Sequence, residues 1–83
     1  DTQNTIRFVG SGRHVLTKMP EMTYLAFASL TPVLGFSIKE AKYELAKTDY
    51  PTNFSLSSNE FVGDKSVTIE LESGIVAVIQ ARD

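Results

Sequence analysis

A segment of seventeen residues, from Met22 to Ile38, carries no charged side chain, although Asp, Glu, Lys and Arg make up 22% of the 83-residue chain. A domain of this size buries only roughly 60–65% of the surface of its unfolded chain, so its capacity to cover apolar residues is limited. The segment must therefore be covered by the rest of the domain or by a partner. It is shorter than the ~20 residues of a spanning helix, and Pro32 and Gly35 interrupt it, so we expect no membrane span.

The composition is that of one globular domain, which we place at residues 1–83, with 42% hydrophobic residues. A net charge of −2 gives no overall attraction to phosphate backbones, so no nucleic-acid partner is expected. The absence of cysteine excludes disulfides, thiolate metal sites and thiol nucleophiles. The first residue, Asp1, fits removal of a signal, and hence secretion or surface association, or cleavage of a tag, so the compartment is not predicted.

Two helices are predicted in the middle of the chain. Pro20 suits the first turn of a helix and Pro32 ends one, so the first helix is expected over about residues 20–31. Ser37 and Glu40 form an S-x-x-E capping box, which predicts the start of a second helix that ends before Pro51. The apolar stripe of the second helix would consist of Ile38, Ala41 and Leu45.

Alternating or continuous apolar residues predict five strands, over about residues 5–9, 13–19, 52–58, 67–72 and 75–79. The glycine-rich residues 10–12 would join the first two strands as a hairpin. The expected order is therefore ββααβββ. We predict an α+β fold in which one antiparallel sheet of about five strands packs against two helices.

The predicted elements carry more apolar surface than one sheet and two helices can cover. The strand 75–79 is apolar on both faces, and the first helix is apolar around nearly all of its circumference. These residues either form the domain core or leave one side open for another chain. In the second case the interface would be formed by Tyr24, Leu25, Phe27, Leu30, Val76 and Val78. We therefore expect a non-enzymatic interaction or assembly module, such as an oligomer subunit, an inhibitor or an accessory structural protein, with a protein partner or a second copy.

One short segment suggests an alternative function, an anion- or nucleotide-binding domain. Its residues are Gly10, Ser11, Gly12, Arg13 and His14. The two glycines could let backbone N–H groups converge on an anion, and the arginine could add a charged fork. However, this loop leads into a predicted strand rather than a helix N-terminus, which favours an ordinary turn.

No motif predicts a catalytic, metal or cofactor site. His14 is the only histidine, and the neighbouring Ser11 does not by itself make a catalytic arrangement. Glu70 and Glu72 share one strand face at about 7 Å spacing, but an alternating strand places such acids in solvent. We therefore predict no enzyme activity, no cofactor and no metal ion.

Residues 4–10, Asn-Thr-Ile-Arg-Phe-Val-Gly, resemble the opening strand of surface-assembled fimbrial subunits. The resemblance covers seven residues, and the cysteine expected of those subunits is absent. It implies a strand at this position, and we carry no function over from it.

Overall fold

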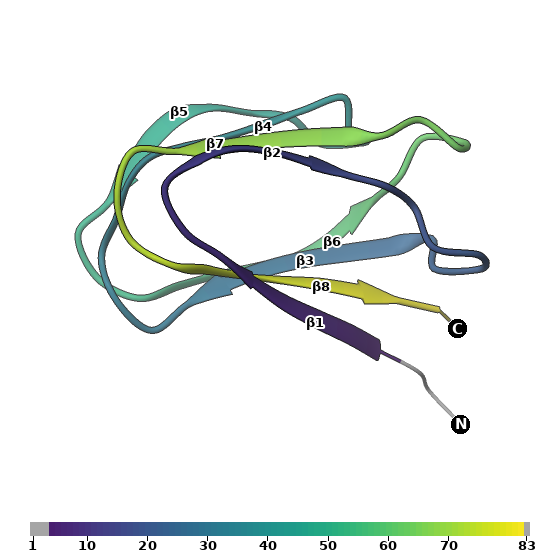
Figure 1. The fold of residues 1–83 in the computed structure, drawn as a ribbon, viewed down its shortest axis with the longest axis horizontal. Coiled ribbons are helices and arrows are strands. Elements are labelled where there is room, and N and C mark those ends of the chain that lie inside the picture. The colour runs from purple at the N-terminus through teal and green to yellow at the C-terminus, as the bar shows by residue number, and fades with distance from the viewer. Residues whose placement is uncertain (1–3, 83) are drawn as a thin grey trace.

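The computed structural model describes residues 4–82, which form eight β-strands and no helix (Figure 1). The strands are β1 (Asn4–Val9), β2 (Gly12–Leu16), β3 (Tyr24–Ser29), β4 (Val33–Lys39), β5 (Leu45–Tyr50), β6 (Phe54–Glu60), β7 (Val67–Leu71) and β8 (Val76–Ala81). Within these residues there is accordingly no helix that could cross a membrane. The predicted α+β fold is wrong, whereas the five predicted strands are confirmed to within a few residues at each end.

The strands form two four-stranded antiparallel sheets that pack face to face as a sandwich (Figure 1). Sheet A has the order β1-β8-β3-β6, and sheet B has the order β2-β7-β4-β5. The chain passes between the sheets at almost every connection, and within residues 4–82 only β4 and β5 are consecutive strands that pair. The expected hairpin of the first two strands is therefore wrong, because β1 pairs with β8 and β2 pairs with β7.

The first predicted helix is instead strand β3, and its side chains alternate between the two faces of sheet A. Leu25 and Phe27 are buried between the sheets, whereas Ala26 and Ala28 face outward and are half-buried. Leu, Ala and Phe are compatible with a helix, but here β3 pairs with β8 on one side and β6 on the other. Tertiary pairing of this kind routinely overrides local helix propensity.

The second predicted helix is a hairpin of β4 and β5. Ile38 and Leu45, which were expected to share a helix stripe, are cross-strand partners in this hairpin. Ala41 is also buried, through a bridge to Phe61. The three apolar residues of the predicted stripe do meet the interior, but they reach it by strand pairing. Glu40 has a positive φ of 72°, which no helix residue adopts, so the predicted capping box does not form.

Aromatic side chains from both sheets meet in the interior. The ring of Phe36 on β4 lies 5.7 Å from that of Phe27 on β3 and 5.5 Å from that of Phe54 on β6, centroid to centroid. Tyr50 on β5 stacks on Phe54 at 4.3 Å. These contacts join one sheet to the other. The outer faces of the sandwich and its open sides take no part in them.

Candidate functional site

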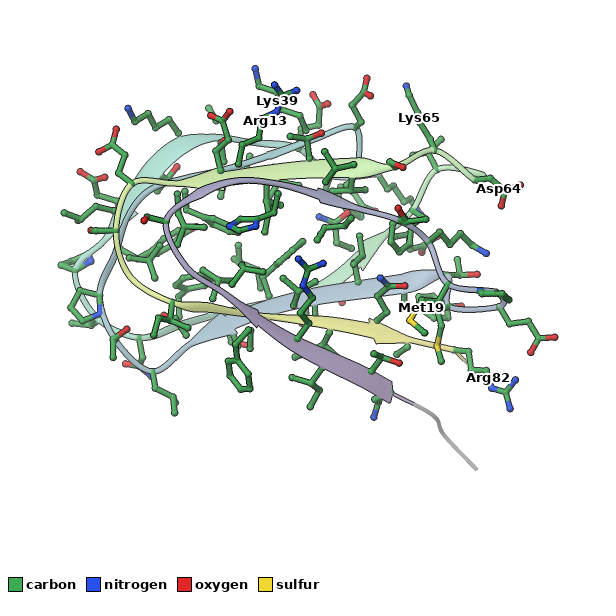
Figure 2. All side chains as sticks on the ribbon, viewed as in Figure 1. Arg13, Met19, Lys39, Asp64, Lys65 and Arg82 are labelled. Atoms are coloured by element: carbon green, nitrogen blue, oxygen red, sulfur yellow. The ribbon has the colours of Figure 1, made fainter. Side chains whose placement is uncertain are left out.

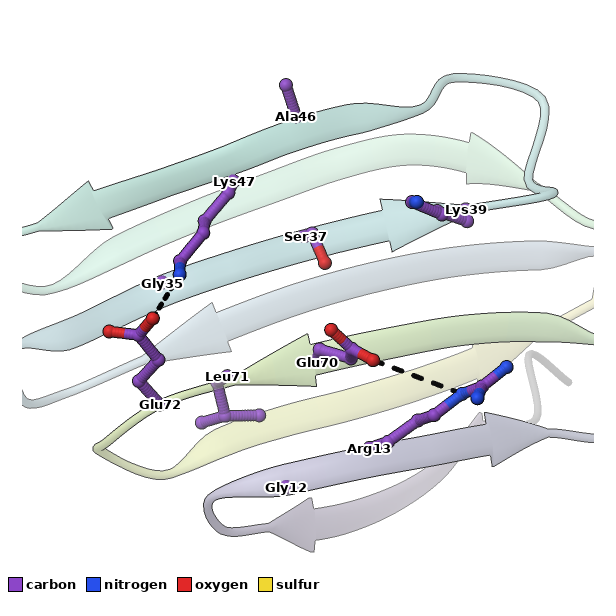
Figure 3. A pocket seen from close by; sticks show the side chains of 10 residues that line it. All are labelled: Gly12, Arg13, Gly35, Ser37, Lys39, Ala46, Lys47, Glu70, Leu71 and Glu72. Atoms are coloured by element: carbon purple, nitrogen blue, oxygen red, sulfur yellow. Dashed lines mark ion pairs between the residues drawn. The ribbon is translucent and has the colours of Figure 1, made fainter.

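The outer face of sheet B is charged (Figure 3). Its shallow hollow of about 570 Å³ is lined by Gly12, Arg13, Gly35, Ser37, Lys39, Ala46, Lys47, Glu70, Leu71 and Glu72. Arg13 Nε lies 4.0 Å from Glu70 Oε2, and Lys47 pairs with Glu72, whose hydrogen bond and charge raise the pKa of the lysine. Because these side chains are exposed and already paired, the face has the character of a solvated surface.

A second hollow, which we call the seam groove, lies between the edge strands β5 of sheet B and β6 of sheet A. Its volume is about 300 Å³, and it is lined by Ile38, Tyr43, Glu44, Leu45, Leu56, Ser57, Ser58 and Asn59. Edge strands leave backbone groups without strand partners, so this side of a sandwich is suited to hold a ligand. The lining combines apolar side chains, an aromatic ring, hydroxyl groups and one carboxylate, as small-molecule sites commonly do.

Asn59 joins the two sides of the seam groove. Its side chain is only 6% exposed. The amide Nδ2 donates to the Tyr43 carbonyl at 2.8 Å, and Oδ1 accepts from the Tyr43 backbone N–H at 3.0 Å and from the Glu60 N–H at 2.9 Å. One buried side chain on β6 therefore fixes the backbone of the loop between β4 and β5 at Tyr43.

The Tyr43 side chain lines the seam groove and remains 57% exposed. The Nζ atom of Lys42 lies 5.5 Å from the centroid of the Tyr43 ring. Lys42 is held by Glu60, with Nζ 3.5 Å from Oε2, and the charge of Glu60 raises the pKa of this lysine. Asn59 thus fixes the backbone that carries the exposed ring, and Lys42, paired with Glu60, lies beside the ring.

Unusual backbone conformations occur beside the same groove. Ser58, which lines it, has a φ of 69°, and Glu40 in the adjoining loop has a φ of 72°. The Glu40 N–H donates to Glu44 Oε2 at 2.7 Å, which holds this carboxylate at the groove. Non-glycine residues with positive φ are uncommon and concentrate at ligand sites, where the surrounding structure maintains the strain.

The groups that line the seam groove are chemically suited to a small flat ligand that carries positive charge. An accessible aromatic ring attracts cations and stacks on planar groups, and the Glu44 carboxylate adds a negative charge close to the ring. Ser57 and Ser58 add hydroxyl groups that can donate or accept hydrogen bonds. Within residues 4–82, no group of three or more His, Asp or Glu side chains is placed to hold a metal ion.

The predicted anion loop lies at the opposite side of the sandwich, where β1 passes into β2. Gly10 and Ser11 form the connection, and Gly12 begins β2 with a φ of 120°. The Arg13 side chain lies on the outer face of sheet B beside that of Glu70, its cross-strand partner on β7 (Figures 2 and 3). His14 Nε2 donates to the Gly10 carbonyl at 2.8 Å. The structure therefore shows a turn stabilised by its own side chains and followed by a strand.

The residues predicted to form an interface divide into two groups. Leu25, Phe27, Val76 and Val78 are buried between the two sheets, so they supply the core of this chain and are not available to another. Tyr24 and Leu30 are exposed. The more conservative of the two sequence interpretations, that of a domain core, therefore holds for four of the six residues.

Sequence reasoning did not find the seam groove. Tyr43 falls within the predicted second helix and Asn59 lies just beyond the predicted strand 52–58, and neither position carries a local motif. Sixteen positions separate the two residues, which meet only because β5 and β6 lie on the same side of the sandwich. The alternation of Phe54 and Leu56 did predict strand β6, but not the strand of the other sheet that faces it.

The fold and the groove together define a small all-β ligand-binding domain. Residues 13–76 match the family model described as "Thiamin pyrophosphokinase, vitamin B1 binding domain". The match includes all the residues that line the seam groove. This chain belongs to that family.

Solved structures support the assignment. A thiamin pyrophosphokinase family protein from Enterococcus faecalis is 36% identical over 98% of this chain, with a TM-score of 0.91. A protein from Lactobacillus plantarum is also 36% identical over 98% of the chain, with a TM-score of 0.88. Thiamine pyrophosphokinase from Bacillus subtilis is 22% identical over 98% of the chain and shares the fold with a TM-score of 0.87. No curated protein matches the chain.

The chain spans only 37–38% of the length of these three structures. The family assignment corrects two expectations from the sequence: a non-enzymatic assembly module, and its alternative, an anion-binding domain at residues 10–14. Both are wrong, because the matching family is a vitamin-binding domain of an enzyme. The family also differs from the fimbrial subunits that residues 4–10 resemble.

Proposed function

We propose that this chain binds thiamin in the seam groove and serves as the thiamin-recognising part of a pyrophosphokinase. The observation that carries the proposal is the family match over residues 13–76, which spans the entire groove. Thiamin contains a planar aminopyrimidine, a thiazolium ring with a permanent positive charge and a hydroxyethyl group. Of the hollows described above, the groove alone combines an exposed aromatic ring with a carboxylate and hydroxyl groups.

Different residues of the groove can each recognise a different part of thiamin. The Tyr43 ring would stack on one of the two heterocycles, and the Glu44 carboxylate would face the thiazolium charge. Ser57 and Ser58 would bond the amino or ring nitrogens of the pyrimidine. The charged face of sheet B is less suitable, because its acids Glu70 and Glu72 already have cationic partners.

In the proposed reaction, the hydroxyethyl oxygen of thiamin bonds to the β-phosphorus of a nucleoside triphosphate. The α–β phosphoanhydride bond breaks, a nucleoside monophosphate leaves, and the hydroxyl proton is released. The residues described here contribute thiamin binding and orientation to this reaction. We assign the nucleotide to the part of such an enzyme that this chain does not span.

Replacing Tyr43 by alanine in the natural, full-length polypeptide should raise the KM for thiamin about 10-fold, because ring stacking contributes roughly 1–2 kcal/mol. The turnover number should change little, since the ring binds the ground state and the transition state alike. Steady-state kinetics with varied thiamin and saturating nucleoside triphosphate measure both constants.

Two further variants control this experiment. Tyr43→Phe keeps the ring and should restore a KM close to that of the unchanged protein. Leu34→Ala alters an exposed side chain on the outer face of sheet B and should leave the KM unchanged. A KM for thiamin that is the same in Tyr43→Ala as in Leu34→Ala would show that thiamin does not bind in this groove.

A further inference from the structure

A further hollow lies at the open side of the sandwich opposite the seam groove. The edge strands at this side are β1 of sheet A and β2 of sheet B, whereas β5 and β6 bound the seam groove. The volume of this hollow, which we call the Arg7 hollow, is about 210 Å³. Its apolar lining is formed by Val15, Leu16, Met19 and Val78. Both open sides of the sandwich therefore carry a hollow between the sheets.

Arg7 is a charged residue on the core-facing side of sheet A. Cross-strand partners in an antiparallel sheet share a face, and the partner of Arg7 is Val78, which is buried between the sheets. The next residue, Phe8, faces outward and is 71% exposed. Because β1 is an edge strand, the Arg7 side chain lines the hollow and is still exposed to solvent. Its charge is thus accessible to a ligand that enters from this side.

The Arg7 guanidinium lacks the acidic partner that the other two arginines have. Arg13 pairs with Glu70, and Arg82 pairs with Glu21. Among residues 4–82, no ion pair and no side-chain hydrogen bond involves Arg7, and no acidic residue lines its hollow. The N–H donors of this guanidinium are therefore available to an added acceptor.

Gln80 on β8 fixes another part of the hollow. Its Oε1 accepts from the Met19 backbone N–H at 3.0 Å, and its Nε2 donates to the Thr17 carbonyl at 3.1 Å. Asn59 makes the same kind of contact at the seam groove, where it bonds the backbone of Tyr43. At each open side, a side-chain amide of sheet A thus holds a connecting segment in place. The Arg7 hollow is therefore preformed, which lowers the cost of binding a ligand.

We propose that the Arg7 hollow is a second ligand site, which binds the carboxylate of a small organic acid with an apolar body. A guanidinium pairs with a carboxylate through two parallel hydrogen bonds, and the hydroxyl groups of Thr5 and Thr17, which line the hollow, can donate to the same group. The apolar lining would cover the body of the acid. The volume is below the roughly 300 Å³ at which sites for drug-sized ligands begin, so the acid must be small.

The charge of the hollow favours a carboxylate over a phosphate. Arg7 is the one charged residue among those that line it in the described part of the chain, so a monoanion balances the charge. A phosphate ester carries a charge of about −1.5 to −2 at pH 7 and would leave negative charge without a partner. This inference does not depend on what the seam groove binds.

The test titrates benzoate into the natural, full-length polypeptide, isotope-labelled for NMR of its backbone amides. Benzoate should shift the signals of residues 5–7 and 15–19 with a dissociation constant of about 1 mM, while the signals of residues 56–60 at the seam groove stay in place. Neutral benzamide keeps the ring but lacks the charge, and it should bind at least roughly 10-fold more weakly. Arg7→Gln should weaken benzoate binding by a similar factor, and because Arg7 is exposed, the variant should fold normally.

Arg13→Gln is the matched control, because it makes the same change at an arginine on the outer face of sheet B, and it should leave the affinity for benzoate unchanged. If Arg7 served only to keep the edge strand from pairing with another sheet, benzoate at about 10 mM would shift none of the signals of residues 5–7 and 15–19, which would overturn the proposal. Equal affinities of Arg7→Gln and Arg13→Gln for benzoate, or tighter binding of phenyl phosphate than of benzoate, would equally overturn it.

Discussion

Replacing Phe36 by alanine is expected to lower the free energy of unfolding by about 3–5 kcal/mol. The Phe36 side chain is fully buried and contacts Phe27 and Phe54, both of which belong to the opposite sheet. Its removal leaves a cavity between the sheets, because paired strands on both sides restrict collapse of the surrounding structure. A domain of this length has a total stability of only about 5–10 kcal/mol, so the variant should be close to unfolding.

Urea denaturation of the 83-residue chain, followed by far-UV circular dichroism, measures this loss. Leu34→Ala on the same strand is the matched control, because Leu34 points outward and is partly exposed. We expect the control to lose less than about 1 kcal/mol. A loss below about 1.5 kcal/mol in Phe36→Ala would mean that the residue does not bridge the two sheets as described.

Replacing Asn59 by leucine should lower the free energy of unfolding by about 3 kcal/mol, although the two side chains have similar volumes. The change removes three hydrogen bonds and leaves the backbone N–H and carbonyl of Tyr43 and the N–H of Glu60 without these partners. Buried polar groups without hydrogen bonds are costly, and apolar replacement of one partner alone does not offset that cost.

The same replacement tests whether Asn59 positions the seam groove. Release of the Tyr43 backbone should raise the KM for thiamin about 10-fold in the natural polypeptide, with little change in the turnover number. Asn53→Leu, in the exposed connection between β5 and β6, is the control and should change neither quantity. If Asn59→Leu were as stable as Asn53→Leu, the three hydrogen bonds would not hold the loop in the way described here.

The sequence allowed β7, whose apolar and polar residues alternate strictly, to be predicted, but not β3 and β4 in the charge-free segment. Val67, Ile69 and Leu71 alternate with polar residues, and β7 follows this pattern within one residue. In β3 the alternation is between large and small apolar residues, Leu25 and Phe27 against Ala26 and Ala28, so polarity gave no sign of period two. One feature of the sequence does distinguish this strand from an apolar helix: small residues, the outward-facing alanines, alternate with large ones.

The sequence did not show which apolar side chains of the last strand are covered by the chain itself. Val76 and Val78 are buried between the two sheets, whereas Ala77 and Ile79 line a hollow on the outer side of sheet A. A strand that is apolar on both faces does not reveal which face the rest of the chain covers. That choice depends on the pairing of β8 with β1 and β3, strands that are distant in sequence.

The seam groove could not be predicted, because the hydrogen bonds between Asn59 and Tyr43 that join its two sides link distant parts of the chain. Asn59 recognises backbone atoms of Tyr43, so the partner residue carries no side-chain signal that a motif could contain. The positive φ at Ser58 is likewise a consequence of tertiary structure, since serine itself does not favour that conformation.

Hydrogen–deuterium exchange of the natural polypeptide with and without thiamin tests the central claim most directly. If thiamin binds in the seam groove, saturating thiamin should slow exchange in peptides that cover residues 40–46 and 56–60, while peptides that cover residues 67–72 on the charged sheet should be unchanged. Protection confined to residues 67–72, or no protection in either part of the groove at saturating thiamin, would contradict the account.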